Sequence, residues 1–578
     1  MKPKYFLILL FLLSFSIEHS SFNITHATVR FVSKSGTSTP PYTSWETAAD
    51  SIQKCINICS FGDTVYVANG TYQEKIIMTR GLALIGSGID SCIIDTRQLS
   101  FLNSDVTLIG NDSCYIEGLD IYTKHASLGI GIRQNNSDIK FCRVQFADLG
   151  IDAIPTYSDR RTVTKCIIVN VQDGIICEGK PLITENTISA NGFGLISQIL
   201  SNPIYLNNII MADPCYKGFS AGFGVKSIVS GNLFIGTGNT AIDAYQNDSI
   251  FNNVILGSNG NWNTGIAGAN TVLYNNHIQN TNMALYYDEP GGLPQVFKHN
   301  NLWQNESNSI YITLDSTNTF NDPMFVNEDS SDFHLQKYSP LIDAGDPNIL
   351  DKDSTRSDIG IYGGPFGESY KYYDLAPRSP INLTALVDTN YITLNWNRNT
   401  EADTSFYKVY RDTVINFTID STKLVSSSAD TFYVQINPHN VTKYVYKVTC
   451  VDKQGNESEP SEEVVVNITS VSVDDYPMTI SDYRLYQNYP NPFNPSTTIS
   501  YRLKERGYVK LYVYDIKGEL VSVLVNKTQE AGFYETKFNV TQESLPAIAS
   551  GIYIYQIMIR SEKDIPVFTD IKKMIYLK

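Results

Sequence analysis

The residues of this chain best suited to acid–base chemistry are a lysine and an aspartate at equivalent positions in a run of short repeats. Lys226 and Asp243 each come directly after a small residue and an aliphatic one, a pair that most of the repeats contain. If the aliphatic side chain points inward, the alternation of a β-strand turns the next side chain outward. Strands stacked side by side would hold Lys226 and Asp243 about 5 Å apart. Lys226 is predicted to act as a base or to bind substrate charge, and Asp243 to act as an acid or a calcium ligand.

Aromatic residues in and near two insertions beside this pair could bind a sugar chain. The insertions are Met211–Gly224 and Leu256–Thr264. The predicted substrate-binding residues are Tyr216, Trp262 and Tyr286. Aromatic rings offer an apolar face, and tyrosine and tryptophan add a polar group at the ring edge. The alternative interpretation is an exposed ion pair of little energetic value beside ordinary surface aromatics.

A second candidate site consists of three aspartates that follow the repeats. Asp351 and Asp353 lie two positions apart, and Asp358 comes shortly after them. Carboxylates and loop carbonyl oxygens are the ligands that calcium prefers, so calcium is the cofactor that these residues suggest. The alternative is that they form turns and caps in a closing loop. The seven histidines and nine cysteines show no zinc-ligand spacing.

The elements that must position these residues belong to a repeat region between Ile116 and Ile310. Nine copies of a six-residue pattern follow one another at intervals of 20 to 25 residues. This period predicts a solenoid in which each coil holds two or three short strands. One coil cannot bury its apolar side alone, but coils stacked at about 4.8 Å can. The fourth positions of the copies are Leu119, Cys142, Cys166, Asn186, Asn207, Asn232, Asn253, Asn276 and Asn300.

These fourth positions are predicted to be structural. Six of the nine are asparagine, and stacked amides can hydrogen-bond along a column. Cys142 and Cys166 fall on adjacent rungs of the same column. They could form a disulfide or remain buried thiols, and thiols are favoured because free cysteine packs well as a small hydrophobe.

The start of the repeat region adds a more specific pattern. It reads Gly62-Asp-Thr-Val-Tyr-Val67, then Gly70-Thr-Tyr72 and Leu82-Ala-Leu-Ile-Gly86. With the repeats, it resembles the exported right-handed parallel β-helix proteins of the pectate-lyase-like type, over residues 28–375. The resemblance implies an extracellular polysaccharide as partner, and calcium-dependent lyase or paired-aspartate hydrolase chemistry. The Gly-His-Gly and paired-aspartate motifs of the polygalacturonase kind are absent, so the resemblance fixes no reaction.

A helix is predicted over residues 48–59, between the first strand and this pattern. Ala49, Ile52 and Ile56 fall on one face of it, and Ser44 could cap its start. Such a helix could cover the open end of the solenoid, whose edge would otherwise invite pairing with another chain.

Two further domains are predicted, so the whole chain is expected to be all-β. Residues 381–468 alternate between apolar and polar positions and resemble a fibronectin type III domain with Trp396 in its core. Residues 483–578 contain Asn488-Tyr-Pro-Asn-Pro-Phe-Asn-Pro495, followed by alternating strands. This segment resembles the C-terminal sorting domain of the type IX secretion system. The resemblance implies that machinery as a partner and a secreted or outer-membrane cell-surface location.

Composition and the first residues agree with export. Residues 1–27 are predicted to be a signal peptide, because two lysines precede an apolar run that is too short to span a membrane. No later stretch reaches 18 apolar residues, so no transmembrane segment is expected after it. The net charge of −15 argues against a nucleic-acid partner and is compatible with neutral glycans or bound calcium.

Two functions remain open from the sequence. The first is a secreted or cell-surface β-helix that binds or cleaves an extracellular polysaccharide, as a polysaccharide lyase or glycoside hydrolase in the enzymatic case. The second is a non-enzymatic adhesion or structural rod. Carboxylates and a base within one groove would favour the first, and a featureless outer face would favour the second.

Overall fold

The computed structural model describes most of the chain between Ala27 and Tyr576. The described residues are 27–100, 105–124, 129–154, 161–199, 201–222, 224–245, 247–268, 270–287, 296–310, 313–387, 391–436, 443–468, 482–488, 491–540, 549–561 and 565–576. The side chains at 212–215, 237 and 258–262 are outside this description, as is the predicted signal peptide apart from its last residue. No helix among the described residues is long and apolar enough to cross a membrane.

The chain divides into two compact units. The first runs to Asn321 and takes in Leu341–Tyr370, and the second consists of Asp322–Pro340 and Lys371–Lys578. The parallel sheets belong to the first unit and the small antiparallel sheets to the second. A hairpin of β31 (Phe325–Asn327) and β32 (Asp332–Leu335) belongs to the second unit, although its sequence lies within the range predicted for the β-helix.

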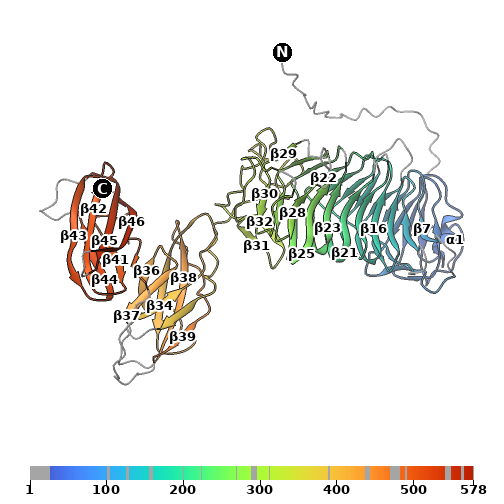
Figure 1. The fold of residues 1–578 in the computed structure, drawn as a ribbon. Coiled ribbons are helices and arrows are strands. Elements are labelled where there is room, and N and C mark those ends of the chain that lie inside the picture. The colour runs from blue at the N-terminus through green and yellow to red at the C-terminus, as the bar shows by residue number, and fades with distance from the viewer. Residues whose placement is uncertain are drawn as a thin grey trace, which may run out of the picture. The chain divides into compact units, whose positions relative to one another are not determined.

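The first unit is a parallel β-solenoid, as the repeats predict (Figure 1). Its first column is a 12-stranded parallel sheet. The last nine strands of this sheet correspond to the nine repeat copies. The strands are β1 (Val29–Val32), β2 (Thr64–Val67), β5 (Ala83–Gly86), β8 (Tyr115–Glu117), β11 (Asp138–Lys140), β14 (Thr162–Thr164), β17 (Leu182–Thr184), β20 (Ile204–Leu206), β22 (Ile228–Ser230), β24 (Ser249–Phe251), β26 (Val272–Tyr274) and β29 (Val296–Lys298).

Two more columns complete each coil. The second contains β3 (Gly70–Tyr72), β6 (Cys92–Asp95), β9 (Asp120–Tyr122), β12 (Arg143–Gln145), β15 (Ile167–Val171), β18 (Thr187–Ala190), β27 (His277–Gln279) and β30 (Asn301–Trp303). The third contains β4 (Ile76–Ile77), β7 (Val106–Ile109), β10 (Ile130–Arg133), β13 (Leu149–Ala153), β16 (Asp173–Cys177), β19 (Phe193–Ser197) and β28 (Met283–Tyr286). Three long strands run through both columns and join them into one sheet: β21 (Ile209–Ala221), β23 (Leu233–Ala244) and β25 (Val254–Gly268).

A left-handed residue turns the chain from the first column to the second in every repeat copy. Its φ lies between 49° and 72° in all nine copies. Glycine adopts this conformation freely and asparagine tolerates it, so five of the nine residues are of these two types. The nine are Gly118, Phe141, Lys165, Glu185, Asn207, Gly231, Asn252, Asn275 and His299.

The next position carries a ladder of buried amides, as the column of asparagines predicts. The backbone N–H and the Nδ2 of Asn186 both donate to Oδ1 of Asn208, over 3.0 and 2.9 Å. Each further rung repeats this arrangement with N···O distances of 2.9–3.2 Å. These rungs are Asn232, Asn253, Asn276, Asn300 and, beyond the predicted copies, Asn318.

One residue of the predicted ladder, Asn207, was wrong. In the doublet Asn207-Asn208 the second residue joins the ladder, and the first is the exposed turn residue. The reason is the register: Tyr205 pairs with Ile183, so this copy begins one residue later than its sequence suggests. The two cysteines of the column, Cys142 and Cys166, are buried free thiols, as predicted.

The helix near the N-terminal end is shorter than predicted. It is α1 (Ile52–Ile56), and its N-cap is Ser51 rather than Ser44. Ala49 cannot belong to it, because the backbone N–H of Ala49 donates to the carbonyl of Phe31 in β1 over 2.9 Å.

The second unit contains two small antiparallel sandwiches. The first sandwich (residues 381–468) buries Trp396 between a three-stranded and a four-stranded sheet, as expected of a fibronectin-like domain. Its strands are β33 (Thr384–Val387), β34 (Tyr391–Asn395), β35 (Thr404–Asp412), β36 (Leu424–Ser428), β37 (Phe432–Ile436), β38 (Lys443–Asp452) and β39 (Val464–Asn467).

The second sandwich (residues 483–578) also packs three strands against four. Its strands are β40 (Arg484–Leu485), β41 (Ser496–Leu503), β42 (Gly507–Asp515), β43 (Leu520–Gln529), β44 (Gly532–Asn539), β45 (Gly551–Arg560) and β46 (Pro566–Tyr576). The chain is therefore all-β apart from α1 among the described residues, as predicted.

Candidate functional site

The predicted pairing of Lys226 with Asp243 was wrong. Asp243 lies in β23 opposite Ser220 of β21, and Lys226 is an exposed residue in the connection between β21 and β22. The small and apolar pair of this coil is Gly218-Phe219, because Phe219 aligns with the inward residues Leu195 and Ile242 of the neighbouring coils. Most of the predicted insertion Met211–Gly224 belongs to strand β21, which ends at Ala221. The Gly224-Val225 pair before Lys226 therefore lies beyond the end of this strand.

The partner of Asp243 is Lys217. The Nζ of Lys217 donates to a carboxylate oxygen of Asp243, and it lies 5.5 Å from the ring centre of Tyr216. Tyr216 is 53% exposed and meets the edge of Phe193 with ring centres 5.5 Å apart. We call this surface, formed by Phe193, Tyr216, Lys217, Ser220 and Asp243, the lateral face. The structure therefore brings two of the predicted site residues, Tyr216 and Asp243, onto one surface.

The remaining predicted aromatics lie on the next coils. Tyr286 ends β28 opposite Ala267, which itself pairs with Asp243, so Tyr286 is two coils from Asp243 in the same outward column. Trp262 lies in β25 opposite Gly238, and its side chain is outside the described part of the structure. Beside the lateral face lies a depression of about 430 Å³, lined by Glu178, Ile196, Ser197, Gln198, Ile199, Ser220, Ala221 and Gly222.

A second surface, which the sequence predictions missed, is a groove of about 470 Å³ at the ends of β1, β2 and β5. Its lining includes Trp45 and Tyr66, which are 48% and 38% exposed. Phe31 pairs with both rings, with centre distances of 4.5 Å to Trp45 and 6.2 Å to Tyr66. We call it the aromatic groove, and its lining is Ser33, Ser35, Trp45, Tyr66, Val67, Ala68, Asn69, Ile85, Gly86 and Ser87. None of these lining residues is charged.

A signal for the aromatic groove exists in the sequence. Tyr66 stands between the inward residues Val65 and Val67, so strand alternation already turns its ring outward. Phe31 occupies the matching position in β1, directly opposite Tyr66. Trp45 could not be placed from sequence, because the segment that carries it was predicted to begin a helix.

The three predicted calcium ligands do not converge. The backbone N–H groups of Asp358 and Gly364 both donate to the carboxylate of Asp351. Asp353 accepts hydrogen bonds from the N–H and Oγ1 of Thr355, at 3.0 and 2.7 Å. Among the described residues, the three carboxylates form no common cluster that could hold an ion. These contacts fit turn and capping roles, the alternative that the sequence left open.

The pKa values of Asp351 and Asp353 shift in opposite directions. Burial raises the pKa of Asp351, and the backbone hydrogen bond from Thr355 lowers that of Asp353. On the solenoid, burial also raises the pKa of Asp173, which accepts the N–H of Phe193 at 3.0 Å. The largest of these pKa shifts is that of Asp248, which follows β23. It is fully buried and accepts the N–H groups of Ser227 and Tyr245, and burial raises its pKa to about 6.

Asp248 gives a pH prediction for the stability of the solenoid. The pKa of Asp248 is higher in the folded than in the unfolded protein, so the folded protein binds this proton more tightly. The contribution of the proton to the unfolding free energy is fully present below about pH 4 and is lost as the pH rises through about 6. Between pH 7.5 and 4.5 the wild type should gain about 2 kcal/mol of unfolding free energy relative to Asp248→Asn. Urea unfolding of both proteins at the two pH values measures this difference. Parallel pH profiles of the two proteins would contradict it.

Comparison with known proteins assigns the second sandwich. The family model of the secretion system C-terminal sorting domain matches residues 487–567. Among curated proteins, an amylopullulanase of Thermoanaerobacterium saccharolyticum is 31% identical over 117 residues, which cover 18% of this chain and only 9% of that enzyme.

Two solved structures show partial similarity to the chain. The pectate lyase Pel9A is 14% identical, with a TM-score of 0.39, over 59% of this chain and 97% of its own. A Fn3-like protein from Clostridium thermocellum is 26% identical, with a TM-score of 0.14, over 17% of this chain and 99% of its own. Residues 487–567 are a type IX secretion system C-terminal sorting domain, and the chain is an exported β-helix protein of the cell surface or the secreted fraction.

Proposed function

We propose that this exported protein binds a neutral extracellular polysaccharide through the aromatic groove. The observation that carries the proposal is the aromatic cluster of Trp45, Phe31 and Tyr66, of which Trp45 and Tyr66 are exposed and line the groove. Sugar rings present C–H faces that pack on aromatic rings, and hydroxyl groups that bond to polar side chains. Ser33, Ser35, Asn69 and Ser87 line the same groove and supply such polar groups.

A neutral chain is favoured over an acidic one. No lysine or arginine lines the aromatic groove, and the chain carries a net charge of −15. An acidic polysaccharide would meet repulsion that no cation in the groove offsets. The lateral face offers a second contact for a long chain, through the exposed ring of Tyr216 beside Phe193.

Binding is proposed rather than cleavage. Hydrolysis needs two carboxylates in distinct roles, and a lyase needs a base that can take a proton from the substrate. On the lateral face, the Nζ of Lys217 is engaged by the carboxylate of Asp243. Within the described residues, the group of three acidic side chains that could hold a metal ion lies in the second unit and not on the solenoid.

A rigid structural rod is the alternative function. The continuous amide ladder from Asn186 to Asn318 favours it, because such a ladder stiffens the solenoid without any ligand. A rod needs no aromatic groove, so the response of sugar binding to changes in that groove separates the two functions.

A screen of the full exported chain tests the proposal. The chain should be retarded in gels that contain neutral polysaccharides such as galactomannan or xyloglucan, and not in gels that contain polygalacturonate. Release of reducing ends or unsaturated products, lost in Asp243→Asn and kept in Lys226→Ala, would instead make it an enzyme with its site on the lateral face. Absence of retardation by every polysaccharide would leave the structural rod.

A further inference from the structure

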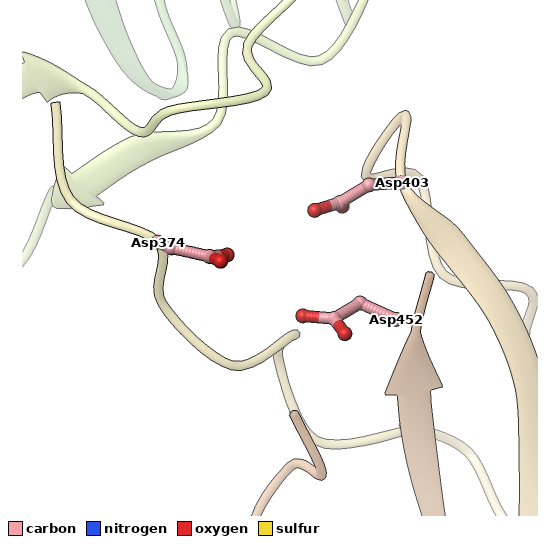
Figure 2. A group of neighbouring side chains, drawn as sticks. All are labelled: Asp374, Asp403 and Asp452. Carbon is pink, nitrogen blue, oxygen red and sulfur yellow. The ribbon is translucent and has the colours of Figure 1, made fainter. Parts of the chain in front are cut away.

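Two aspartates of the first sandwich and one from the segment that precedes it lie close together (Figure 2). Asp374 lies in the segment that leads into the sandwich, Asp403 immediately precedes β35, and Asp452 is the last residue of β38. One carboxylate oxygen of each lies within 4.8 Å of the others. The carboxylates point toward a common space between the three segments (Figure 2).

Local hydrogen bonds fix one of these carboxylates. Oδ1 of Asp452 accepts the N–H groups of Gln454, Gly455 and Asn456 at 2.7–2.9 Å. Nδ2 of Asn456 donates to the other oxygen of Asp452 at 2.9 Å and to Asp374 at 3.3 Å. The turn at residues 452–456 accounts for the position of the Asp452 carboxylate, and Asn456 connects Asp452 to Asp374. Neither interaction involves Asp403.

Asp403 is the observation that points to a missing partner. It is only 5% exposed and is directed at the other two aspartates, and the one hydrogen bond to its carboxylate within the described residues comes from its own backbone N–H. Burial raises its pKa, and the charges of Asp452, Glu401 and Asp374 raise it further. One buried carboxylate oxygen of Glu401 is also without a partner, while its other oxygen is taken by Arg378.

A buried carboxylate beside two other carboxylates is unfavourable unless a cation or several donors compensate its charge. No lysine or arginine in the described part of the chain forms an ion pair with Asp374, Asp403 or Asp452. Lys453 directly follows Asp452 in the chain, and its Nζ donates to the carbonyl of Ala402 at 2.9 Å.

We propose that Asp374, Asp403 and Asp452 bind a calcium ion that fastens the leading segment to the loops of the first sandwich. The ligands are all oxygens, which suits calcium and not zinc. Calcium accepts irregular geometry and fills its shell with loop carbonyls and water, whereas magnesium demands a near-ideal octahedron. The protein is exported, and extracellular calcium modules bind with dissociation constants of about 10⁻⁴–10⁻³ M.

Calcium titration of the full chain tests the site. Isothermal calorimetry should show one site in the range of about 10⁻⁴–10⁻³ M. In 10 mM calcium, the melting transition of the first sandwich should rise by about 6–20 °C over that in EDTA, the larger value for the tighter binding. Magnesium at the same concentration should give a much smaller shift.

Matched variants test whether the calcium-induced rise in melting temperature depends on these aspartates. Asp403→Asn should abolish the calcium shift, and its melting temperature in EDTA should equal or exceed that of the wild type, because a buried charge has been removed. Asp420→Asn is the control: Asp420 is an exposed aspartate of the same sandwich, bonded to Thr422, and its loss should leave the shift intact.

Three results would overturn the proposal. The first is a wild-type melting curve that calcium does not change up to 10 mM. The second is an unchanged calcium shift in Asp403→Asn, which would place the ion elsewhere, for example at Asp351. The third is a strong loss of stability in Lys453→Met without any calcium response, which would make that lysine the compensating cation.

Discussion

Replacing Asn208 by alanine is expected to lower the free energy of unfolding of the solenoid by about 3–5 kcal/mol. Oδ1 of Asn208 accepts both the backbone N–H and one N–H of the Nδ2 of Asn186, and these two hydrogens would be left buried without an acceptor, although the Nδ2 keeps its bond to the carbonyl of Val163. The substitution also removes the bonds that Nδ2 of Asn208 makes to Asn232 and to the carbonyl of Ile183, each 2.9 Å long. A buried donor without a partner costs about 1–3 kcal/mol, so two of them account for most of the loss.

The neighbouring residue supplies a matched control. Asn207 is exposed, its φ is 55°, and its side chain makes one long bond of 3.3 Å to the carbonyl of Phe366. Asn207→Gly should change the stability by less than about 1 kcal/mol, because glycine adopts this conformation freely. Urea midpoints of the two variants and the wild type measure the difference. Equal effects of the two substitutions would show that the ladder does not stabilise the coils.

Disruption of the second sandwich is expected to abolish export completely. The sorting segment is held together from both its ends: the N–H of Phe493 donates to the carbonyl of Ile575 at 2.9 Å, and the N–H of Ile575 donates to Asn491 at 2.7 Å. Phe493 is buried against Tyr576 with ring centres 5.3 Å apart. Deletion of residues 566–578 should therefore be as damaging as deletion of residues 483–578.

A pair of substitutions in β46 gives the sharper test of export. Met574 is fully buried, and Ile571 of the same strand is 55% exposed. Met574→Lys places a charge in the core and should retain the protein inside the cell, whereas Ile571→Lys should be exported. Immunoblots of cells, cell surface and medium from the native host measure the distribution. Normal export of Met574→Lys would show that the folded sandwich is not the signal.

Periodic features of the fold were predictable from sequence because they depend on neighbouring coils that share one pattern. The asparagine column, the inward aliphatic positions and the buried Cys142 and Cys166 follow from the repeat alone. Positions where the repeat is interrupted were not predictable. Asn207 and Asn208 are chemically identical, and only the pairing of Tyr205 with Ile183 decides which of them enters the ladder.

The candidate sites were predicted less well because they lie where the repeat is interrupted or outside the repeats. Lys226 follows a small and aliphatic pair, but strand β21 ends at Ala221 and its outward cation is Lys217. The aromatic groove depends on Trp45, which lies in a turn that resembles a helix start in sequence. The cluster around Asp403 joins residues far apart in the chain, and nothing in their local sequence shows that they meet.

The measurement that tests the central proposal most directly is affinity electrophoresis of the full chain in neutral polysaccharides, with matched tryptophan variants. Trp45→Ala removes an exposed ring of the aromatic groove, and Trp303→Ala removes a partly buried tryptophan from β30, near the other end of the solenoid. We expect Trp45→Ala to weaken binding by about tenfold or more, since an aromatic anchor contributes over 1.4 kcal/mol, and Trp303→Ala to bind like the wild type. Equal retardation of Trp45→Ala and the wild type, or retardation by acidic polysaccharides alone, would contradict the proposal.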